Sequence, residues 1–255
     1  MTTPRVKDLI PIPALEESRR LLVVQAHPDD ADIGAGATIA KLAASGVDIT
    51  LLTVTDGGVG YLDASVPPQE VARMRHREAQ EAAHTLGITN PLLWLDFPDG
   101  GSLPLFEVRA GITRAIRQTK PDTVMVMDPW LLYEAHSDHR CVGLATAEAC
   151  LLANFPHFCP QDLEAGIGPH QVNAVAFYGT ARPNTFIDVT DTWNTKMAAI
   201  MKHESQFPEE SREIFTAYLT AKARELAEGR GFELAEAFKV VTHIHLHFNV
   251  DTEQY

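Results

Sequence analysis

The sequence predicts an α/β fold, and two observations carry this prediction. Short apolar runs rich in β-branched residues alternate with helix-compatible stretches along the chain. Polar clusters directly follow two of these runs, as at the carboxyl ends of strands in open α/β sheets. We therefore expect a Rossmann-like three-layer sandwich with a mostly parallel central sheet. With 255 residues, 45% of them hydrophobic, the chain is predicted to form a single domain, residues 1–255.

The first half of the chain shows the alternation most clearly. The run Leu21 to Ala26 predicts a buried strand, and residues 33–44 predict a helix that ends before Ser45-Gly46. A second strand at 47–55 completes a strand–helix–strand unit of about 35 residues, the length of a parallel βαβ unit. The following elements are expected as a helix at 68–86, a strand at 92–95, a helix at 105–120 and a strand at 123–127.

The second half continues with less regular spacing. The expected elements are a helix at 137–154, strands at 172–178 and 186–189, helices at 192–203 and 209–228, and a last strand at 238–248. Residues 1–19 are predicted to be an irregular N-terminal segment. Residues 155–169, which contain several prolines and glycines, are predicted to be a loop that lines or covers the ligand pocket.

Charge and apolar patterning exclude several classes of protein. The net charge of −13 disfavours binding to nucleic acids and to anionic lipid surfaces. There is no run of eighteen apolar residues and no signal-peptide pattern, so we predict a cytoplasmic protein without a membrane span. Cys141, Cys150 and Cys159 lie nine residues apart, which fits neither a zinc knuckle nor a disulfide framework.

Two polar clusters carry the candidate chemistry: His27-Pro28-Asp29-Asp30 and His136-Ser137-Asp138-His139. Two imidazoles and one carboxylate from separate loops can bind Zn²⁺ and leave one coordination position open, as catalytic zinc sites do. A further carboxylate beside a ligand can act as a general base. Taken singly, each cluster also suits ordinary turn or N-cap chemistry. The occurrence of both clusters at strand ends favours a hydrolytic metal site.

These motifs resemble the LmbE-like, or PIG-L, family of metal-dependent N-acetylglucosaminyl deacetylases. Ala26 to Asp30 is similar to the opening signature of that family, and His136 to His139 is similar to its second motif. Further similar segments are 32–39, 52–57, 75–79, 99–100, 203–206 and 235–238, together with Lys196. The resemblance therefore extends over most of the chain, from about residue 21 to residue 238.

The resemblance implies a role for each residue of the site. The implied metal ligands are His27, Asp30 and His139. Asp29 is implied to be the general base and His136 to stabilise the oxyanion, while Asp138 tunes a neighbouring imidazole. Arg75 matches a family arginine that binds substrate, although Arg73 and Arg77 beside it are typical of a solvated helix face. Members of the family often assemble as trimers or hexamers.

The predicted function is a zinc-dependent hydrolase that removes the N-acetyl group of an N-acetylglucosamine-type sugar or glycoconjugate and releases acetate. The partner would be this small-molecule amino sugar, with no nucleic acid involved. The same ligand types also hold Fe²⁺ or Co²⁺. Two alternatives remain open: a non-haem Fe(II) enzyme with a two-histidine, one-carboxylate site, and a non-catalytic module that binds metal or sugar.

Other motifs receive weaker interpretations. His243, His245 and His247 alternate with apolar residues and would share one face of the last strand, as a second metal site or a polar surface. Gly34 and Gly36 suggest a dinucleotide fingerprint, but its third glycine is missing. The segment 203–206 is interpreted as a structural part of the pocket wall, and residues 130–133 as an apolar wall of the site or as plain packing.

Overall fold

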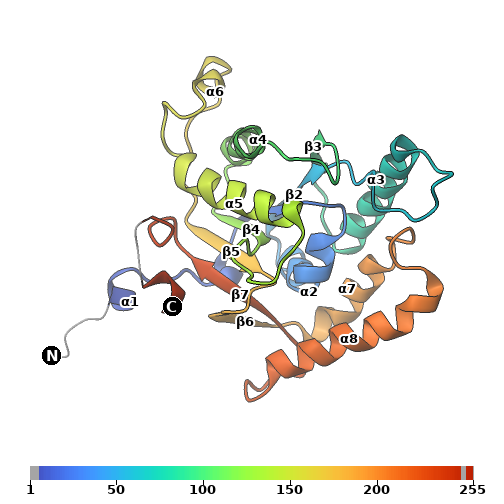
Figure 1. Cartoon of the computed structure of the whole chain (residues 1–255). Coiled ribbons are helices and arrows are strands. Elements are labelled where there is room, and N and C mark those ends of the chain that lie inside the picture. Colours follow the sequence, from blue (N-terminus) through green and yellow to red (C-terminus); the bar gives the residue numbers. More distant parts are fainter. Residues whose placement is uncertain (1–5, 248–250, 255) are drawn as a thin grey trace.

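Seven strands form one mixed sheet at the centre of the molecule (Figure 1). The computed structural model describes residues 6–247 and 251–254. In sheet order the strands are β3 (Leu93–Phe97), β2 (Asp48–Thr55), β1 (Arg20–Gln25), β4 (Thr123–Met127), β5 (Ala174–Tyr178), β7 (Ala235–Val241) and β6 (Thr185–Asp188). β1 to β5 pair in parallel, and β7 is antiparallel to both β5 and β6. The predicted mostly parallel sheet is confirmed.

Helices cover both faces of this sheet, which confirms the predicted three-layer architecture (Figure 1). The α-helices are α1 (Val6–Leu9), α2 (Asp30–Ala44), α3 (Pro68–Thr85), α4 (Leu105–Thr119), α5 (Ser137–Leu152), α6 (Pro160–Glu164), α7 (Trp193–Ile200) and α8 (Glu209–Ala227). Short 3-10 helices occur at η1 (Leu15–Glu17), η2 (Thr190–Thr192) and η3 (Thr252–Gln254). None of the helices in the described residues is long and apolar enough to cross a membrane.

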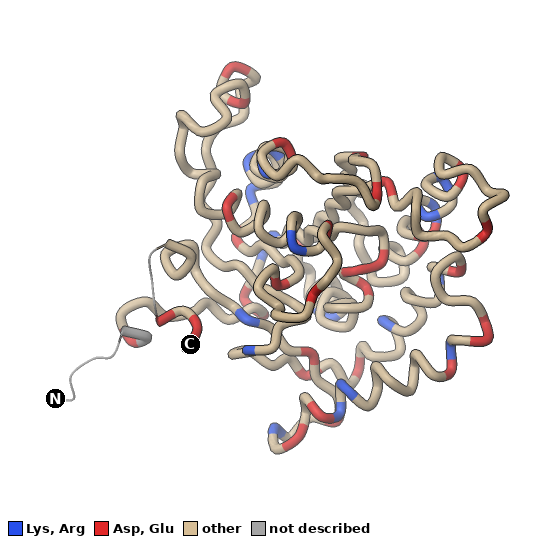
Figure 2. Tube along the Cα trace, viewed as in Figure 1, with Lys and Arg blue, Asp and Glu red and all other residues tan. Residues whose placement is uncertain are grey.

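Two hydrophobic cores hold the layers together, and β1 contributes to both. Leu21 and Val23 face the core formed with α2, α3, α7 and α8, whereas Leu22 and Val24 face the core formed with α4 and α5. This alternation follows from the two-residue period of a strand whose faces are both covered. Acidic and basic residues are intermingled along the trace, so no single element concentrates the negative charge (Figure 2).

The two glycines of the suggested dinucleotide fingerprint have a packing role. A Cβ atom on Gly34 would lie 2.3 Å from the ring of Tyr178, and one on Gly36 would lie 3.1 Å from Lys196. Both glycines therefore allow α2 to approach side chains of β5 and α7 closely. The helix itself begins at Asp30, the last residue of the first polar cluster, and ends before Gly46, whose φ of +85° favours glycine.

The prediction for the last strand was wrong beyond Val241. Residues 243–247 form turns, with hydrogen bonds from His245 N to Thr242 O and from Leu246 N to His243 O. The His245 imidazole is buried, and its Nδ1 atom lies 2.8 Å from Thr242 Oγ1. This contact holds residues 242–245 in a turn, directly after β7 ends at Val241. The three histidines therefore share no strand face. Phe248, where the predicted strand ended, lies outside the described residues.

The expectation for residues 155–169 was also wrong. The segment contains α6 and lies near the carboxyl-terminal ends of α4 and α5 (Figure 1). Because α5 begins at the edge of the sheet where the strands end, its far end and the following loop lie at the other edge. There the buried Arg117 binds backbone oxygens of this loop. The irregular N-terminal segment likewise contains α1 and η1.

Candidate metal centre and active site

The polar clusters meet at the carboxyl edge of the parallel strands. Residues 27–30 follow β1, Asp99 follows β3, and residues 134–139 follow β4. β1 lies beside both β2 and β4, so the loops after β1 and β4 are neighbours in space. α2 and α5 begin at Asp30 and Ser137, directly within these loops. The predicted site residues are thus brought together by the order of the strands.

Donor atoms of three residues converge at the centre of the cluster. His27 Nδ1 lies 3.2 Å from His139 Nε2 and 3.5 Å from Asp30 Oδ2, while His139 Nε2 lies 3.2 Å from Asp30 Oδ1. Ligands at about 2.0–2.1 Å from one tetrahedral cation would be separated by about 3.3 Å. The imidazole of His136 is close as well, with its ring centroid 4.4 Å from that of His139.

Each of the two central imidazoles turns its other nitrogen toward carboxylates. His27 Nε2 lies 3.3 Å from Asp99 and 3.4 Å from Asp138, and His139 Nδ1 lies 3.4 Å from Glu134. Histidines that bind metals usually have such an outer partner, which fixes the tautomer and the ring orientation. The donor set of two nitrogens and one carboxylate therefore fits a divalent transition-metal ion.

The electrostatics of the cluster reflect its buried carboxylates. Burial alone would lower the pKa of His27, but hydrogen bonds and charges from Asp30 and Asp99 raise it to about 10. Burial favours the neutral form of Asp30, yet His139 and His27 lower the pKa of that carboxyl. The pKa of His139 is raised by Asp30 against the effect of burial. Without a metal, positive charge on these imidazoles compensates the carboxylates.

Asp29 lies beside the cluster with Arg75 as its partner. Arg75 Nη2 is 3.1 Å from Asp29 Oδ1, and the arginine is almost fully buried. Burial raises the pKa of Asp29 and the charge of Asp30 adds to this, while Arg75 opposes it. A carboxylate with a raised pKa is a better proton acceptor near neutral pH. Arg75 therefore lies inside the site, unlike a solvated helix arginine.

His136 and Asp138 take distinct positions at the start of α5. His136 Nδ1 accepts a hydrogen bond from Asp138 N, which leaves its proton on Nε2. Burial lowers the pKa of His136, as do the charges of His27 and His139, which favours the neutral ring that donates from Nε2. The Asp138 carboxylate accepts from Gly100 N and faces His27. The imidazole that Asp138 contacts is thus His27.

A cavity of about 270 Å³, the catalytic pocket, opens on this cluster. Its lining residues are His27, Asp29, Val59, Gly60, Arg75, Asp99, Gly100, His136 and Gln206. Charged and hydrogen-bonding groups dominate this list. Such a lining suits a ligand that carries several hydroxyl groups, because each buried polar group requires a partner.

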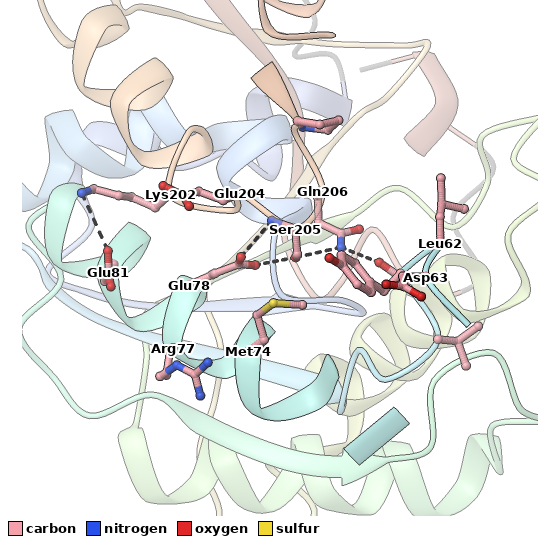
Figure 3. Close-up of a pocket in the computed structure, with 14 residues that line it drawn as sticks. Leu62, Asp63, Met74, Arg77, Glu78, Glu81, Lys202, Glu204, Ser205 and Gln206 are labelled. Carbon is pink, nitrogen blue, oxygen red and sulfur yellow. Dashed lines mark hydrogen bonds and ion pairs between the residues drawn. The ribbon is translucent and has the colours of Figure 1, made fainter. Parts of the chain in front are cut away.

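A larger cavity of about 1040 Å³ lies next to the catalytic pocket and shares Val59, Gly60 and Gln206 with it (Figure 3). Gln206 Nε2 donates to Gly60 O, which joins the loop after β2 to the segment between α7 and α8. Ser205 donates from its N and Oγ atoms to Glu78 on α3. These contacts form the wall between the two cavities, so the predicted structural interpretation of residues 203–206 describes part of their role.

The sequence analysis assigned no role in the site to three further residues, although two of them, Asp99 and Gln206, lie in segments that resemble the family. Asp99 follows a strand end, so the rule that placed the other carboxylates at this edge could have identified it. Glu134 lies in the loop before α5 and has no sequence signal of its own. Gln206 belongs to a segment interpreted as structural, yet it lines the catalytic pocket.

Comparison with known proteins assigns the family. A sequence profile of the GlcNAc-PI de-N-acetylase (PIG-L) family matches residues 22–150. The chain is 41% identical over 229 residues to the diacetylchitobiose deacetylase of Thermococcus kodakarensis, covering 90% of this chain and 85% of that protein. The chain belongs to the PIG-L family. Its members are amidohydrolases that act on N-acetyl groups, and the family predicted from the motifs is confirmed.

Other similarities separate fold from chemistry. The structure superposes on N,N'-diacetylchitobiose deacetylase from Pyrococcus horikoshii with a TM-score of 0.92 and 33% identity, covering 98% of this chain and 95% of the other. A hydratase, the 4-carboxy-2-hydroxymuconate hydratase of Pseudomonas putida, gives a TM-score of 0.73 at 21% identity over 88% of this chain and 96% of its own. The fold is therefore shared by proteins with different reactions.

Proposed function

We propose that this PIG-L protein is a zinc-dependent hydrolase that removes the N-acetyl group of an N-acetylglucosamine-type sugar or glycoconjugate and releases acetate. The observation that carries this proposal is the convergence of His27, Asp30 and His139 beside Asp29. The names of two relatives support the substrate class. One is the diacetylchitobiose deacetylase described above; the other is a 1D-myo-inositol 2-acetamido-2-deoxy-alpha-D-glucopyranoside deacetylase of Kineococcus radiotolerans, 34% identical over 57% of this chain and 48% of that protein.

The proposed ligands are the three residues with converging donor atoms: His27, Asp30 and His139. A zinc ion there would polarise the acetyl carbonyl and acidify the attacking water. Asp29 would accept the proton of that water, since its carboxylate lines the same pocket and burial raises its pKa. Arg75 would hold Asp29 in position through the contact between Nη2 and Oδ1.

His136 would stabilise the charge that develops on the carbonyl oxygen. Its Nδ1 atom accepts from Asp138 N, so its Nε2–H is available to donate into the pocket. The proton that Asp29 has taken would then pass to the departing amine. Asp138, together with Asp99, would keep the His27 ring oriented. In total, one amide and one water molecule give one acetate and one free amine.

The shape of the site supports a substrate larger than a single acetyl amide. The catalytic pocket offers charged partners for sugar hydroxyls, and Arg75 and Asp99 lie side by side in it. The adjoining cavity has room for the rest of a glycoconjugate beyond Gly60 and Gln206. We therefore propose that Arg75 and Asp99 contact the sugar that carries the acetamido group, and that the remainder extends toward the adjoining cavity.

The decisive experiment is an acetate-release assay on N-acetylglucosamine and diacetylchitobiose, with wild type and Asp29→Ala compared after metal analysis. Removal of a general base typically slows a reaction by about 10²–10⁴-fold. We expect a loss of this size in kcat, with about one metal ion per chain in both proteins, as one open site predicts.

Other outcomes would exclude specific parts of the proposal. Equal rates in the two proteins would remove Asp29 as the base. Acetate release that persists after complete metal removal would exclude metal catalysis. Oxygen consumption in place of acetate release would favour the non-haem iron alternative, and binding of both sugars without turnover would favour the binding module.

The assembly is a separate part of the proposal and rests on the family resemblance. We propose a homo-oligomer, a trimer or a hexamer, and light scattering coupled to size-exclusion chromatography tests it. A mass of 28.0 kDa at working concentrations would correspond to the chain alone and would contradict it.

A further inference from the structure

A second cavity reaches the candidate metal cluster from another side. It encloses about 390 Å³, and its lining includes Asp30, His139 and Glu134. None of its lining residues belongs to the catalytic pocket, which contains Asp29, Arg75 and the other sugar-facing groups. The cluster thus lies between two cavities, and a substrate bound at the cluster can extend into both.

The walls of this second cavity are mainly apolar. One stripe of α8 faces it, with Phe215, Leu219 and Leu226 at helical spacing. From the opposite side Met127, at the end of β4, and Leu131, in the following loop, complete the wall. Leu131 is the part of the predicted apolar segment 130–133 that reaches the cavity. Trp130, Leu132 and Tyr133 are exposed.

Two buried charged groups in the lining of this cavity are already paired with each other. Lys196 Nζ lies 2.6 Å from Glu236 Oε1, and both side chains are almost fully buried. Glu236 also accepts hydrogen bonds from Ala37 N and Thr38 N. A paired charge with all its partners attracts no ionic ligand. The other lysine of the lining, Lys222, is exposed on α8, so the rest of the wall favours an apolar ligand. Burial of apolar surface is the interaction that it offers.

The chemistry of an amide determines which part of a substrate enters each cavity. The reacting carbon carries two groups, the nitrogen with its sugar and the acyl chain, and these point in different directions. The hydroxyl-rich sugar matches the charged catalytic pocket, and the acyl chain matches the apolar cavity. The acyl chain of an acetyl group is a single methyl, which would fill only a small part of this cavity. The cavity has more than ten times the volume of a water molecule, which is about 30 Å³.

We propose that this cavity is an acyl-chain subsite and that the enzyme hydrolyses N-acyl glucosamines with chains longer than acetyl, such as butyryl and hexanoyl. The reaction is unchanged: water adds to the carbonyl, the C–N bond breaks, and a carboxylic acid and the free amine are released. This inference rests on the proposed N-deacylase function and extends its substrate class.

The test compares N-acetyl-, N-butyryl- and N-hexanoyl-glucosamine with the metal-loaded enzyme. Release of glucosamine is measured, because this product is common to all three substrates. We expect kcat/KM for the hexanoyl compound to be within tenfold of that for the acetyl compound or above it. In Leu219→Trp and in Leu131→Trp, which fill the cavity from two sides, the hexanoyl-to-acetyl ratio should fall at least tenfold.

A matched control uses the same helix. Ile214→Trp adds a similar side chain on the exposed face of α8, outside the cavity, and should leave the ratio unchanged. Acetyl turnover with hexanoyl turnover at least a hundredfold lower in wild type would overturn the inference and leave the proposed function intact. Loss of turnover with all three substrates would overturn the proposed function itself. An unchanged ratio in both filled variants would also exclude this cavity as the acyl site.

Product binding gives a readout that does not depend on turnover. Each added methylene that is buried strengthens binding by about fourfold at most. Hexanoate should therefore bind wild type at least tenfold more tightly than acetate in calorimetry, and this preference should disappear in Leu219→Trp. Equal affinity for acetate and hexanoate in wild type would contradict the subsite.

Discussion

Two buried clusters of charge, at opposite edges of the same sheet, differ in how their polar atoms are paired. At the amino edge Arg117 is fully enclosed, and its Nε and both Nη atoms donate to Ala153, Phe155, Phe158 and Cys159 oxygens and to Asp162. At the carboxyl edge His27 and His139 instead point nitrogen atoms at each other across 3.2 Å. In the first cluster every donor of the arginine has an acceptor. In the second, ligand atoms converge on one point that a metal ion could occupy.

This difference distinguishes a structural cluster from a functional one. The five hydrogen-bond donors of an arginine can all be matched by carbonyl and carboxylate oxygens, and at Arg117 they are. When both imidazoles are protonated, as their raised pKa values favour in the metal-free cluster, two N–H groups face each other across 3.2 Å and repel. A cation between the nitrogens resolves this conflict, since both then act as ligands. Burial alone therefore does not identify a functional site, but mutually facing ligand atoms do.

The largest expected effect on folding is at the amino edge. Arg117→Met would leave the half-exposed Arg114 as the remaining guanidinium partner of Asp162 and would leave four backbone oxygens without their donor. Breaking a buried ion pair in this way costs about 3–5 kcal/mol. We expect the free energy of unfolding, measured with urea, to fall by this amount, while kcat per folded molecule stays the same.

A control for this substitution lies on the same helix. Arg114 contacts the other oxygen of Asp162 at 3.1 Å but is about half exposed, so Arg114→Met should cost less than about 1 kcal/mol. Equal losses for the two arginines would mean that the backbone contacts of Arg117 add nothing to the fold.

At the carboxyl edge we expect a change in metal affinity with little change in folding. Asp138→Asn keeps an oxygen for the bond from Gly100 N but removes the charge that faces His27 Nε2. Loss of such an outer partner typically weakens metal affinity or activity by about 10–100-fold. Metal titration of the apoprotein measures the affinity. An unchanged affinity would show that Asp99 alone orients His27.

Metal removal should destabilise the carboxyl edge by a smaller amount. A ligand that binds the folded chain at 100 times its Kd stabilises it by about 2.7 kcal/mol. Chelation should therefore lower the Tm of wild type, and His139→Ala should show no such decrease because one of the three proposed ligands is missing. A chelator effect of equal size in both proteins would place the stabilising metal elsewhere in the chain.

The carboxyl edge was easier to predict from sequence than the elements around it. The clusters at 27–30 and 136–139 are local motifs directly after or near predicted strands, so topology alone brings them together. Glu134 was missed because its contact with His139 depends on the path of a loop. The sequence left two interpretations of Arg75, because the burial of a helical arginine depends on its neighbours in space. Here the contacts of Arg75 with Asp29 and with Gly57 O hold it inside the site.

The two errors have physical causes. The alternating histidines after Val241 have the two-residue period of a strand, but the side-chain contact of His245 with Thr242 favours a turn there. The loop at 155–169 was assigned to the wrong edge of the sheet. It follows a helix that starts at the carboxyl edge, and a helix of 16 residues is about 24 Å long. The direction of α5 alone therefore predicts that residues 155–169 lie at the amino edge of the sheet.

A smaller effect is expected at the pair of His203 and Asp32, which lies between the site and the core. His203 Nε2 is 3.0 Å from Asp32 Oδ2, and the histidine is fully buried. Burial would lower the pKa of His203, but Asp32 and the nearby Asp29 and Glu78 raise it. A raised folded pKa contributes stability that is fully present below the unfolded value of about 6.5 and is lost as pH rises through the folded pKa.

The free energy of unfolding of wild type should therefore decrease above pH 6.5 more steeply than that of His203→Gln, which keeps a hydrogen-bond donor but cannot titrate. The exposed His157→Gln controls for loss of an imidazole as such and should follow wild type. Parallel pH profiles for wild type and His203→Gln would mean that the imidazole is neutral in the folded protein. Asp32 would then accept a hydrogen bond from a neutral imidazole. The stability that this pair contributes would be independent of pH in this range, as it is for the apolar core.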